Sequence, residues 1–238
     1  MKNIKAILFD LDGTLLPMEL DDFSKAYFSE IAKFMQDYGY ESKMLIHAMM
    51  SAIAEMVKND GKDTNEVVFW KKFAEFYGDR LFADKGRFDE FYHKKFDDVK
   101  SSCSYSEYAA KIIRSAKEKG YRLILATSPL FPAVATEKRM VWAGLSPEDF
   151  EFYTTYENSR HSKPSIEYYK DILSYLSLSA EECLMVGNHV EEDMVAEELG
   201  MNVYLVTDCL INKNEVDISR YEQGSLSDLF EKIQNSEI

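Results

Sequence analysis

The chain has 238 residues, of which 46% are hydrophobic and 29% are charged, and its formal net charge is -14. This composition is typical of a globular protein with a sizeable core and excludes a disordered chain. The acidic balance excludes generic binding to nucleic acid or to an anionic membrane, because both require a basic protein face.

Three further features indicate the cytoplasm. No stretch reaches the roughly 18 consecutive apolar residues that a membrane span needs. Asp10 and Asp12 interrupt the apolar run near the N-terminus, so no secretory signal is expected. The cysteines are odd in number and far apart, without metal-type spacing, as expected of reduced thiols. The oligomeric state is not indicated by any feature of the sequence.

The first predicted element is a buried strand over residues 4–9, a nearly continuous apolar run that stops at Asp10. From residue 17 to about residue 102, apolar and aromatic side chains instead recur at helical spacing. Gly39, the turn at 59–61 and Gly78 separate the helical segments. The expected helices cover about residues 20–38, 45–58, 64–77 and 88–96. We therefore expect an all-helical unit here.

Beyond residue 106, short apolar runs alternate with helical patterns. Strands are expected at 122–126, 152–155, 184–186 and 203–206, and helices near 112–119, 134–142, 166–176, 190–199 and 226–233. This alternation predicts right-handed crossovers and a doubly wound, parallel α/β sheet. Because the first strand belongs to the same sheet, the helical block is an insertion. The prediction is an α/β core of residues 1–16 and 103–238 with a helical cap of residues 17–102.

Polar residues follow three of these predicted strands. They are Asp10, Thr127 with Ser128, and Asn188 after Gly187. Ligands of doubly wound sheets bind at the carboxyl ends of the strands. The sequence therefore predicts a binding or active site at this edge of the sheet.

Two carboxylates, those of Asp10 and Asp12, stand two residues apart directly after the first strand. Like charges at such a distance repel each other, and a cation relieves the repulsion. Magnesium prefers carboxylate and water oxygens as ligands. The pair is a candidate magnesium site, although an isolated pair of this kind is equally compatible with a solvated turn.

The string DLDGTL at residues 10–15 resembles the first motif, DxDx(T/V), of the haloacid dehalogenase (HAD) superfamily. Within it, the chain resembles the phosphatases and phosphomutases that carry a helical cap after the first strand. The second motif, a strand that ends in Thr or Ser, has its counterpart in Thr127. The third, a Lys before a helix, has its counterpart in Lys163, and Pro164 is well placed in the first turn.

The fourth motif is Gly-Asp followed four or five residues later by a second Asp. Here Gly187 and Asp193 match, but Asn188 replaces the first acid. Glu192 stands at the shorter of the two spacings, and we favour Asp193. An amide oxygen still ligates a hard cation but carries no charge, so we expect weaker magnesium binding rather than loss of the metal.

The resemblance implies a Mg²⁺-dependent hydrolase. Asp10 would attack phosphorus and form an aspartyl-phosphate, while Asp12 would act as general acid and base. Magnesium would be held by Asp10, Asp12 through its backbone carbonyl, and Asp193. Asn188 is expected to ligate the metal weakly or to contact a metal-bound water. Thr14 is expected to orient Asp12 by a hydrogen bond.

The resemblance also implies how phosphate is bound. The hydroxyl of Thr127, the backbone N–H of Ser128 and the ammonium of Lys163 would hold the phosphoryl oxygens of a small phosphorylated metabolite. The cap would close over the site and exclude water. His161 and His189 flank these motifs and could contact the substrate or a water near the metal, but loop histidines of this kind are more often exposed polar groups, which is the interpretation favoured here.

Several alternatives share this scaffold. A sugar phosphomutase uses the same motifs and differs in whether the cap keeps water from the intermediate. A hydrolytic dehalogenase dispenses with the metal and the second acid, so Asp12 and Asp193 argue against it. A phosphonate hydrolase needs a Schiff-base lysine from the cap, and no lysine there is distinguished. A non-catalytic binding protein would not need the intact motif residues.

Overall fold

A computed structural model describes residues 4–238, so residues 1–3 of the expected core lie outside the described residues. Within this part of the chain, six parallel strands form one sheet in the order β3-β2-β1-β4-β5-β6. The strands are β1 Ala6–Phe9, β2 Arg122–Leu125, β3 Phe152–Tyr153, β4 Cys183–Gly187, β5 Asn202–Val206 and β6 Glu222–Gly224. The predicted parallel α/β sheet is confirmed.

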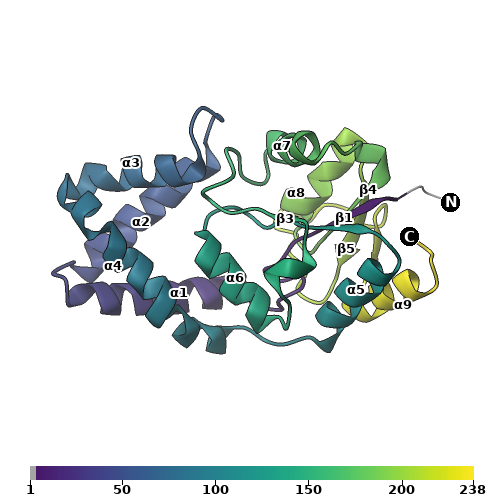
Figure 1. Ribbon diagram of the computed structural model, residues 1–238, viewed down its shortest axis with the longest axis horizontal. Coiled ribbons are helices and arrows are strands. Elements are labelled where there is room, and N and C mark those ends of the chain that lie inside the picture. The colour runs from purple at the N-terminus through teal and green to yellow at the C-terminus, as the bar shows by residue number, and fades with distance from the viewer. Residues whose placement is uncertain (1–3) are drawn as a thin grey trace.

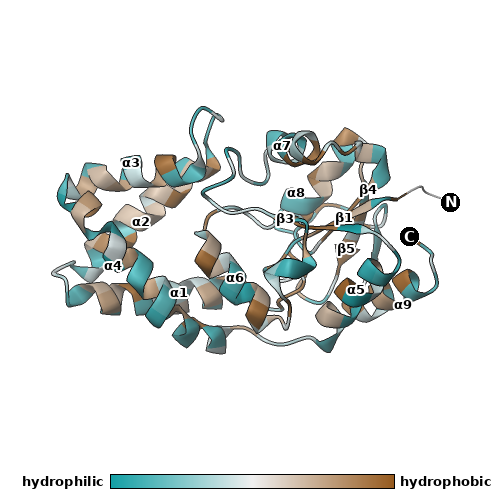
Figure 2. Ribbon diagram, in the orientation of Figure 1, coloured by the Kyte–Doolittle hydropathy of each residue, from teal (hydrophilic) through white to brown (hydrophobic). Residues whose placement is uncertain are grey.

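Both faces of the sheet are buried, as the apolar strand sequences predict. Ile7 and Phe9 belong to the cluster on one face with residues of α5, α6 and α9, whereas Ala6 and Leu8 belong to the cluster on the other face with residues of α7 and α8. These helices are α5 Glu107–Glu118, α6 Ala133–Trp142, α7 Ile166–Leu176, α8 Val190–Asp193 and α9 Leu226–Gln234. Figure 2 shows β1 and β5 coloured as hydrophobic between helices of mixed colour.

The remaining helices form a block between β1 and α5, at the opposite end of the molecule from α9 (Figure 1). They are α1 Leu20–Gln36, α2 Ser42–Val57, α3 Asn65–Tyr77, α4 Arg80–Lys94 and a 3₁₀ helix at Phe96–Ser102. Thr64 caps α3 by accepting a hydrogen bond from the backbone N–H of Val67, so the predicted start of this helix is confirmed. No helix among residues 4–238 is long and apolar enough to cross a membrane.

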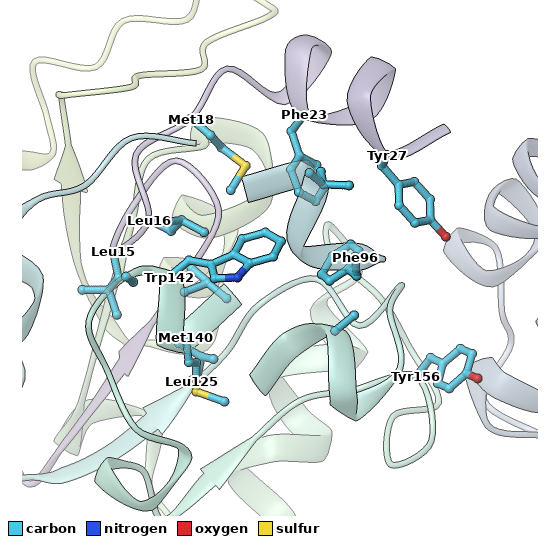
Figure 3. Close-up of a cluster of buried hydrophobic side chains, with 14 of the residues drawn as sticks. Leu15, Leu16, Met18, Phe23, Tyr27, Phe96, Leu125, Met140, Trp142 and Tyr156 are labelled. Atoms are coloured by element: carbon cyan, nitrogen blue, oxygen red, sulfur yellow. The ribbon is translucent and has the colours of Figure 1, made fainter. Parts of the chain in front are cut away.

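Aromatic side chains join the helical block to the α/β part. The ring of Phe96 stacks on that of Trp142 in α6 at 5.0 Å between centroids, and Tyr27 of α1 meets Phe131 edge-on at 5.1 Å. Figure 3 shows Phe96 and Trp142 with Phe23 of α1 beside them. One continuous buried cluster therefore runs from the sheet into the helices and fixes where α1 stands above the strand ends.

The elements differ most from the sequence prediction in three places. The sixth strand, β6, was not predicted, because Glu222-Gln223-Gly224 has no apolar alternation and is a strand only through its pairing with β5. The helix expected at 190–199 changes to a 3₁₀ helix at Met194, directly after the buried Asp193. The fourth cap helix begins at Arg80, well before the predicted start, and ends before Phe96.

Candidate active site

The strand register brings the predicted site residues to one edge. Phe9 is paired with Leu125 of β2 on one side and with Val186 of β4 on the other. The residues that follow these three positions therefore leave the sheet at the same level. The backbone N–H of Asp10 donates to the carbonyl of Val186 at 2.9 Å, which holds the first turn residue against β4.

The turn after β1 requires Gly13. Its φ is +85°, a left-handed conformation that favours glycine, and a Cβ there would lie 2.3 Å from Nδ2 of Asn188. The N–H of Gly13 donates to the carbonyl of Leu16 at 2.8 Å, and that of Thr14 donates to the carbonyl of Leu11 at 3.1 Å. The backbone thus folds back at once and places Asp10, Asp12 and Asn188 around one small volume.

Lys163 lies between two carboxylates. Its Nζ donates to Oδ1 of Asp10 at 2.8 Å and to Oδ1 of Asp193 at 2.6 Å, and all three side chains are buried. Burial alone would lower the pKa of Lys163, but Asp10 and Asp193 together raise it well above the ordinary value. The ammonium therefore carries its positive charge at neutral pH and lies against both carboxyl groups.

Asp193 uses both of its carboxylate oxygens. Oδ2 accepts a hydrogen bond from the backbone N–H of His189 at 2.9 Å, while Oδ1 is bonded to Lys163. Burial raises the pKa of Asp193 to about 7, Lys163 opposes this effect, and Asp10 adds to it. A Cβ at Gly187 would lie 2.1 Å from Oδ2 of Asp193, so the glycine of the fourth motif makes room for this acid.

Thr14 contacts Asp10 and Asn188 rather than Asp12. Its Oγ1 lies 3.1 Å from Oδ2 of Asp10 and 2.9 Å from Oδ1 of Asn188, and its one proton serves one of them at a time. Asn188 is oriented by donating from Nδ2 to the carbonyl of Cys209 at 2.6 Å. The expected hydrogen bond from Thr14 to Asp12 is absent because the Asp12 side chain is turned to another partner.

That partner is Arg139 of α6, which the sequence analysis missed. Its guanidinium forms an ion pair with Oδ2 of Asp12, is fully buried, and lies over the ring of Phe131 at 4.5 Å. Further contacts to the carbonyl of Ala135 and the hydroxyl of Thr136, both at 3.3 Å, hold it in place. The helical spacing could have indicated its burial, because Arg139 stands four positions after Ala135 and so lies on the same buried face of α6.

Asp12 keeps one oxygen without a partner. Its Oδ1 is buried and makes no hydrogen bond, and the residue lines the cavity. Burial raises the pKa of Asp12, although Arg139 acts in the opposite direction. The side chain is thus fixed through one oxygen and has the other free for a ligand.

The cavity at this edge has a volume of about 370 Å³. Its polar lining includes Asp10, Asp12, Thr127, Ser128, Asn188 and Asp193, which are predicted site residues from three different strand ends. The carbonyl of Thr127 accepts hydrogen bonds from the hydroxyls of Thr154 at 2.6 Å and Tyr168 at 2.9 Å, which fixes the backbone at this position.

The two histidines near the motifs differ from each other. His189 is buried and lines the cavity, contrary to the interpretation as an exposed loop residue. Its ring nitrogens lie 3.3 Å from Glu191 and 3.8 Å from Glu192 without hydrogen-bond geometry, and burial lowers its pKa. His161 does not line this cavity and instead pairs with Asp171 at 2.7 Å.

The oxygen atoms at the strand ends suit a hard cation. Among residues 4–238, no three His, Cys, Asp or Glu side chains are arranged to hold a metal ion, and Lys163 lies between Asp10 and Asp193. The carboxylate of Asp10 and the amide oxygen of Asn188, however, both contact Oγ1 of Thr14 and both line the cavity. Carboxylate and amide oxygens are ligands that Mg²⁺ accepts.

The sheet order places the chain in the Rossmann-like α/β class, and the carboxylates lie at the strand ends where ligands of such sheets bind. The sequence model of the haloacid dehalogenase-like hydrolases matches residues 4–200, and the chain belongs to this family.

Known proteins resemble the chain over nearly its full length. It is 26% identical over 243 residues to the glyceraldehyde 3-phosphate phosphatase of Methanocaldococcus jannaschii, with 98% of each chain covered. A HAD phosphatase from Thermococcus onnurineus is 19% identical, with a TM-score of 0.57 and coverage of 96% of this chain and 97% of that one. A predicted phosphoglycolate phosphatase from Haemophilus somnus is 16% identical, with a TM-score of 0.60 and coverage of 97% and 98%. The expected HAD-superfamily hydrolase is thereby confirmed, and so is its fold.

Proposed function

We propose that the chain is a Mg²⁺-dependent phosphatase that hydrolyses a small phosphorylated metabolite through an aspartyl-phosphate on Asp10. The observation that carries the proposal is the position of Asp10, which lines the cavity while Lys163 holds one of its oxygens and Thr14 contacts the other. A carboxylate restrained at both oxygens has little orientational freedom left to lose when it attacks. Glyceraldehyde 3-phosphate, the substrate for which the Methanocaldococcus jannaschii relative is named, is itself a small phosphorylated metabolite.

The proposed reaction has two steps. An oxygen of Asp10 attacks phosphorus, the bond from phosphorus to the leaving oxygen breaks, and protonated Asp12 gives its proton to the leaving alcohol. Water then attacks the same phosphorus, Asp12 takes a proton from this water, and the bond from phosphorus to the Asp10 oxygen breaks. This restores the Asp10 carboxylate and releases inorganic phosphate. Burial raises the pKa of Asp12, which is the direction that the acid step requires.

The other site residues would bind and orient the phosphoryl group. Thr127 and Ser128 line the cavity at the end of β2 and would donate to the phosphoryl oxygens, as the resemblance to the family implies. The charge of Lys163, held beside Asp10, would lower the repulsion between this carboxylate and an approaching phosphate. Arg139 holds Asp12 and is thus a positioning residue.

Phosphatases of this family generally use Mg²⁺, and we propose the same here. Asp10, the backbone carbonyl of Asp12, and Asp193 or Asn188 would hold the ion. Asn188 is the freer of the last two, because both oxygens of Asp193 already accept hydrogen bonds. A bound ion would supply positive charge against the charge that develops on the phosphoryl group.

We also propose that residues 17–102 act as a cap and that the protein is cytoplasmic. Helices α1 and α2 supply part of the cavity lining, as expected of a cap that covers the site. The described cysteines are free, which is compatible with a reducing compartment.

The test is release of inorganic phosphate from a panel of small phosphate monoesters that includes glyceraldehyde 3-phosphate. We expect release to require Mg²⁺ and to stop with EDTA, and we expect Asp10→Asn to lower it by about 10³-fold or more. Asp37→Asn, at an exposed position after α1, is the matched control and should retain full activity. Release that survives in Asp10→Asn would contradict the proposed nucleophile.

A further inference from the structure

The walls of the cavity are chemically unlike each other. The wall at the strand ends is polar, whereas the wall opposite is mainly apolar. Apart from the hydroxyl of Ser24 on α1, it is built by Leu20, Phe23 and Phe28 of α1, Met50 and Ile53 of α2, and Phe131 after β2. In a phosphatase of the proposed kind the phosphoryl group lies at the strand ends. The apolar wall therefore faces the part of the substrate that leaves with the oxygen.

The aromatic part of this wall is held rigidly. Phe23 and Tyr27 contact Phe131 edge-on at 6.0 Å and 5.1 Å between centroids, and the hydroxyl of Tyr27 is bonded to that of Tyr92 at 2.7 Å. Because the Tyr27 hydroxyl is already engaged in this bond, its ring presents mainly carbon to the cavity. Rigid apolar surface loses little entropy when a ligand covers it.

The rim of the wall exposes apolar side chains. Met50 is 55% exposed, and Phe28 and Ile53 are half-buried, although all three line the cavity. Covering such surface with an apolar ligand removes it from water and is favourable. The volume of about 370 Å³ lies near the lower end of the range for small-molecule sites, which fits a compact ligand.

No lysine or arginine of residues 4–238 lines the cavity. Lys163 is bonded to Asp10 and Asp193, and Arg139 is bonded to Asp12. Glu192 adds a further acid to the lining. A second anionic group on the substrate, such as a carboxylate or another phosphate, would therefore lie near carboxylates, and no lysine or arginine of the lining would pair with it.

We infer that the substrate is the phosphate monoester of an uncharged, apolar alcohol, alkyl or aryl, whose carbon skeleton packs on the wall of α1, α2 and Phe131. The inference rests on the proposed phosphatase function and specifies its substrate class. Glyceraldehyde 3-phosphate, the substrate for which the Methanocaldococcus jannaschii relative is named, also carries no charge beyond its phosphate, but it is polar. The apolar wall of this chain predicts a preference for carbon over hydroxyl groups.

The experiment is a chain-length series of ethyl, butyl and hexyl phosphate, with phosphate release measured in the presence of Mg²⁺. The leaving alcohols of this series are of nearly equal reactivity, so differences in kcat/KM report binding of the chain. We expect kcat/KM to rise about fourfold per methylene, the factor that corresponds to about 0.8 kcal/mol per buried methylene. Glycerol 3-phosphate should fall below butyl phosphate, and 2-phosphoglycolate should fall below ethyl phosphate.

Two variants of α2 test whether the wall itself makes this distinction. Ile53→Asn changes a residue of the wall, whereas Ile46→Asn makes the same change two turns earlier. Ile46 is half-buried and lines an adjoining groove, which shares Phe28 and Met50 with the cavity, but Ile46 itself does not line the cavity. Both residues pack against the same core, so the two variants share any general loss of stability. We expect Ile53→Asn to lower the ratio of hexyl to ethyl kcat/KM about tenfold and Ile46→Asn to leave this ratio unchanged.

The outcomes separate the inference from the proposed function. A flat chain-length series, or 2-phosphoglycolate as the better substrate, would overturn the apolar substrate class and leave the phosphatase in place. If kcat/KM rises with chain length equally steeply in Ile53→Asn and in the unmodified protein, the inference that the alkyl chain packs on this wall would be overturned. Absence of phosphate release from every ester would overturn the proposed function and the inference with it.

Discussion

Arg139 and Asp12 stand 127 positions apart in the chain and form an ion pair at the wall of the cavity, with the arginine fully buried. Replacing Arg139 by Met should lower the free energy of unfolding by about 3 kcal/mol, because it leaves the Asp12 carboxylate largely buried and unpaired. Urea unfolding measures this change. Arg114→Met, at an exposed position of α5, is the control and should stay within about 0.5 kcal/mol.

A double variant sharpens this prediction. Asp12→Asn combined with Arg139→Met removes both charges, so its stability should exceed that of Arg139→Met alone. An equal loss in both variants would mean that the packing of the arginine, rather than its charge, stabilises the fold.

The Lys163 cluster predicts an asymmetry between two substitutions. Lys163→Met leaves the carboxylates of Asp10 and Asp193 without their cation and should lower the free energy of unfolding by about 3–5 kcal/mol. Asp193→Asn leaves the carboxylate of Asp10 paired with the ammonium of Lys163, so it should lower the free energy of unfolding much less. Urea unfolding of both variants in the same metal-free buffer, at neutral pH, tests the order, and equal losses would argue against charge balance as the cause.

The same cluster predicts a pH dependence of stability. Burial raises the pKa of Asp193 from 3.8 in the unfolded chain to about 7, so the folded state binds more protons between these values. The free energy of unfolding contributed by this group is therefore highest below pH 4 and is lost as the pH rises to about 7. The free energy of unfolding is measured in EDTA from pH 5 to pH 8 for the unmodified protein and for Asp193→Asn. Over this range, the value for the unmodified protein should fall relative to that of the variant. A difference that is constant with pH would contradict the prediction.

The turn after β1 should tolerate no side chain at Gly13. Gly13→Ala brings a Cβ to 2.3 Å from Asn188 at a φ of +85°, so it should displace Asn188 and lower phosphatase activity tenfold or more. Gly86→Ala is the matched control, since a Cβ at this position of α4 meets nothing within 4 Å. In a helix this change should raise the free energy of unfolding by about 0.5–1 kcal/mol without altering activity.

Asn188→Asp should strengthen magnesium binding. It adds a negative charge at an oxygen that already lies 2.9 Å from Oγ1 of Thr14, and it restores the usual acid of the fourth motif. The readout is the Mg²⁺ concentration for half-maximal phosphate release, which should fall. Asn214→Asp, on an exposed loop, adds the same charge away from the cavity and should leave this concentration unchanged.

Much of the core was predictable because its signals are local. The apolar runs that become β1, β2, β4 and β5 end in polar residues, and the helix predicted at 166–176 has the bounds Ile166–Leu176. The strand β6 was not predictable, because it exists only through hydrogen bonds to β5. The burial of His189 was likewise hidden, since it depends on packing around a loop rather than on its neighbours in sequence.

The sequence by itself determined the family, the parallel α/β sheet and the identity of the residues at its carboxyl edge, since each depends on short-range patterns. Only the tertiary structure decided the partners of these residues. Lys163 meets Asp10 across 153 positions, and Arg139 meets Asp12 across 127. It also decided that the cavity is apolar opposite the carboxylates, because α1 and α2 are placed there by packing against the core rather than by any motif. Charge pairing and burial depend on distances in space, which residue order alone does not specify.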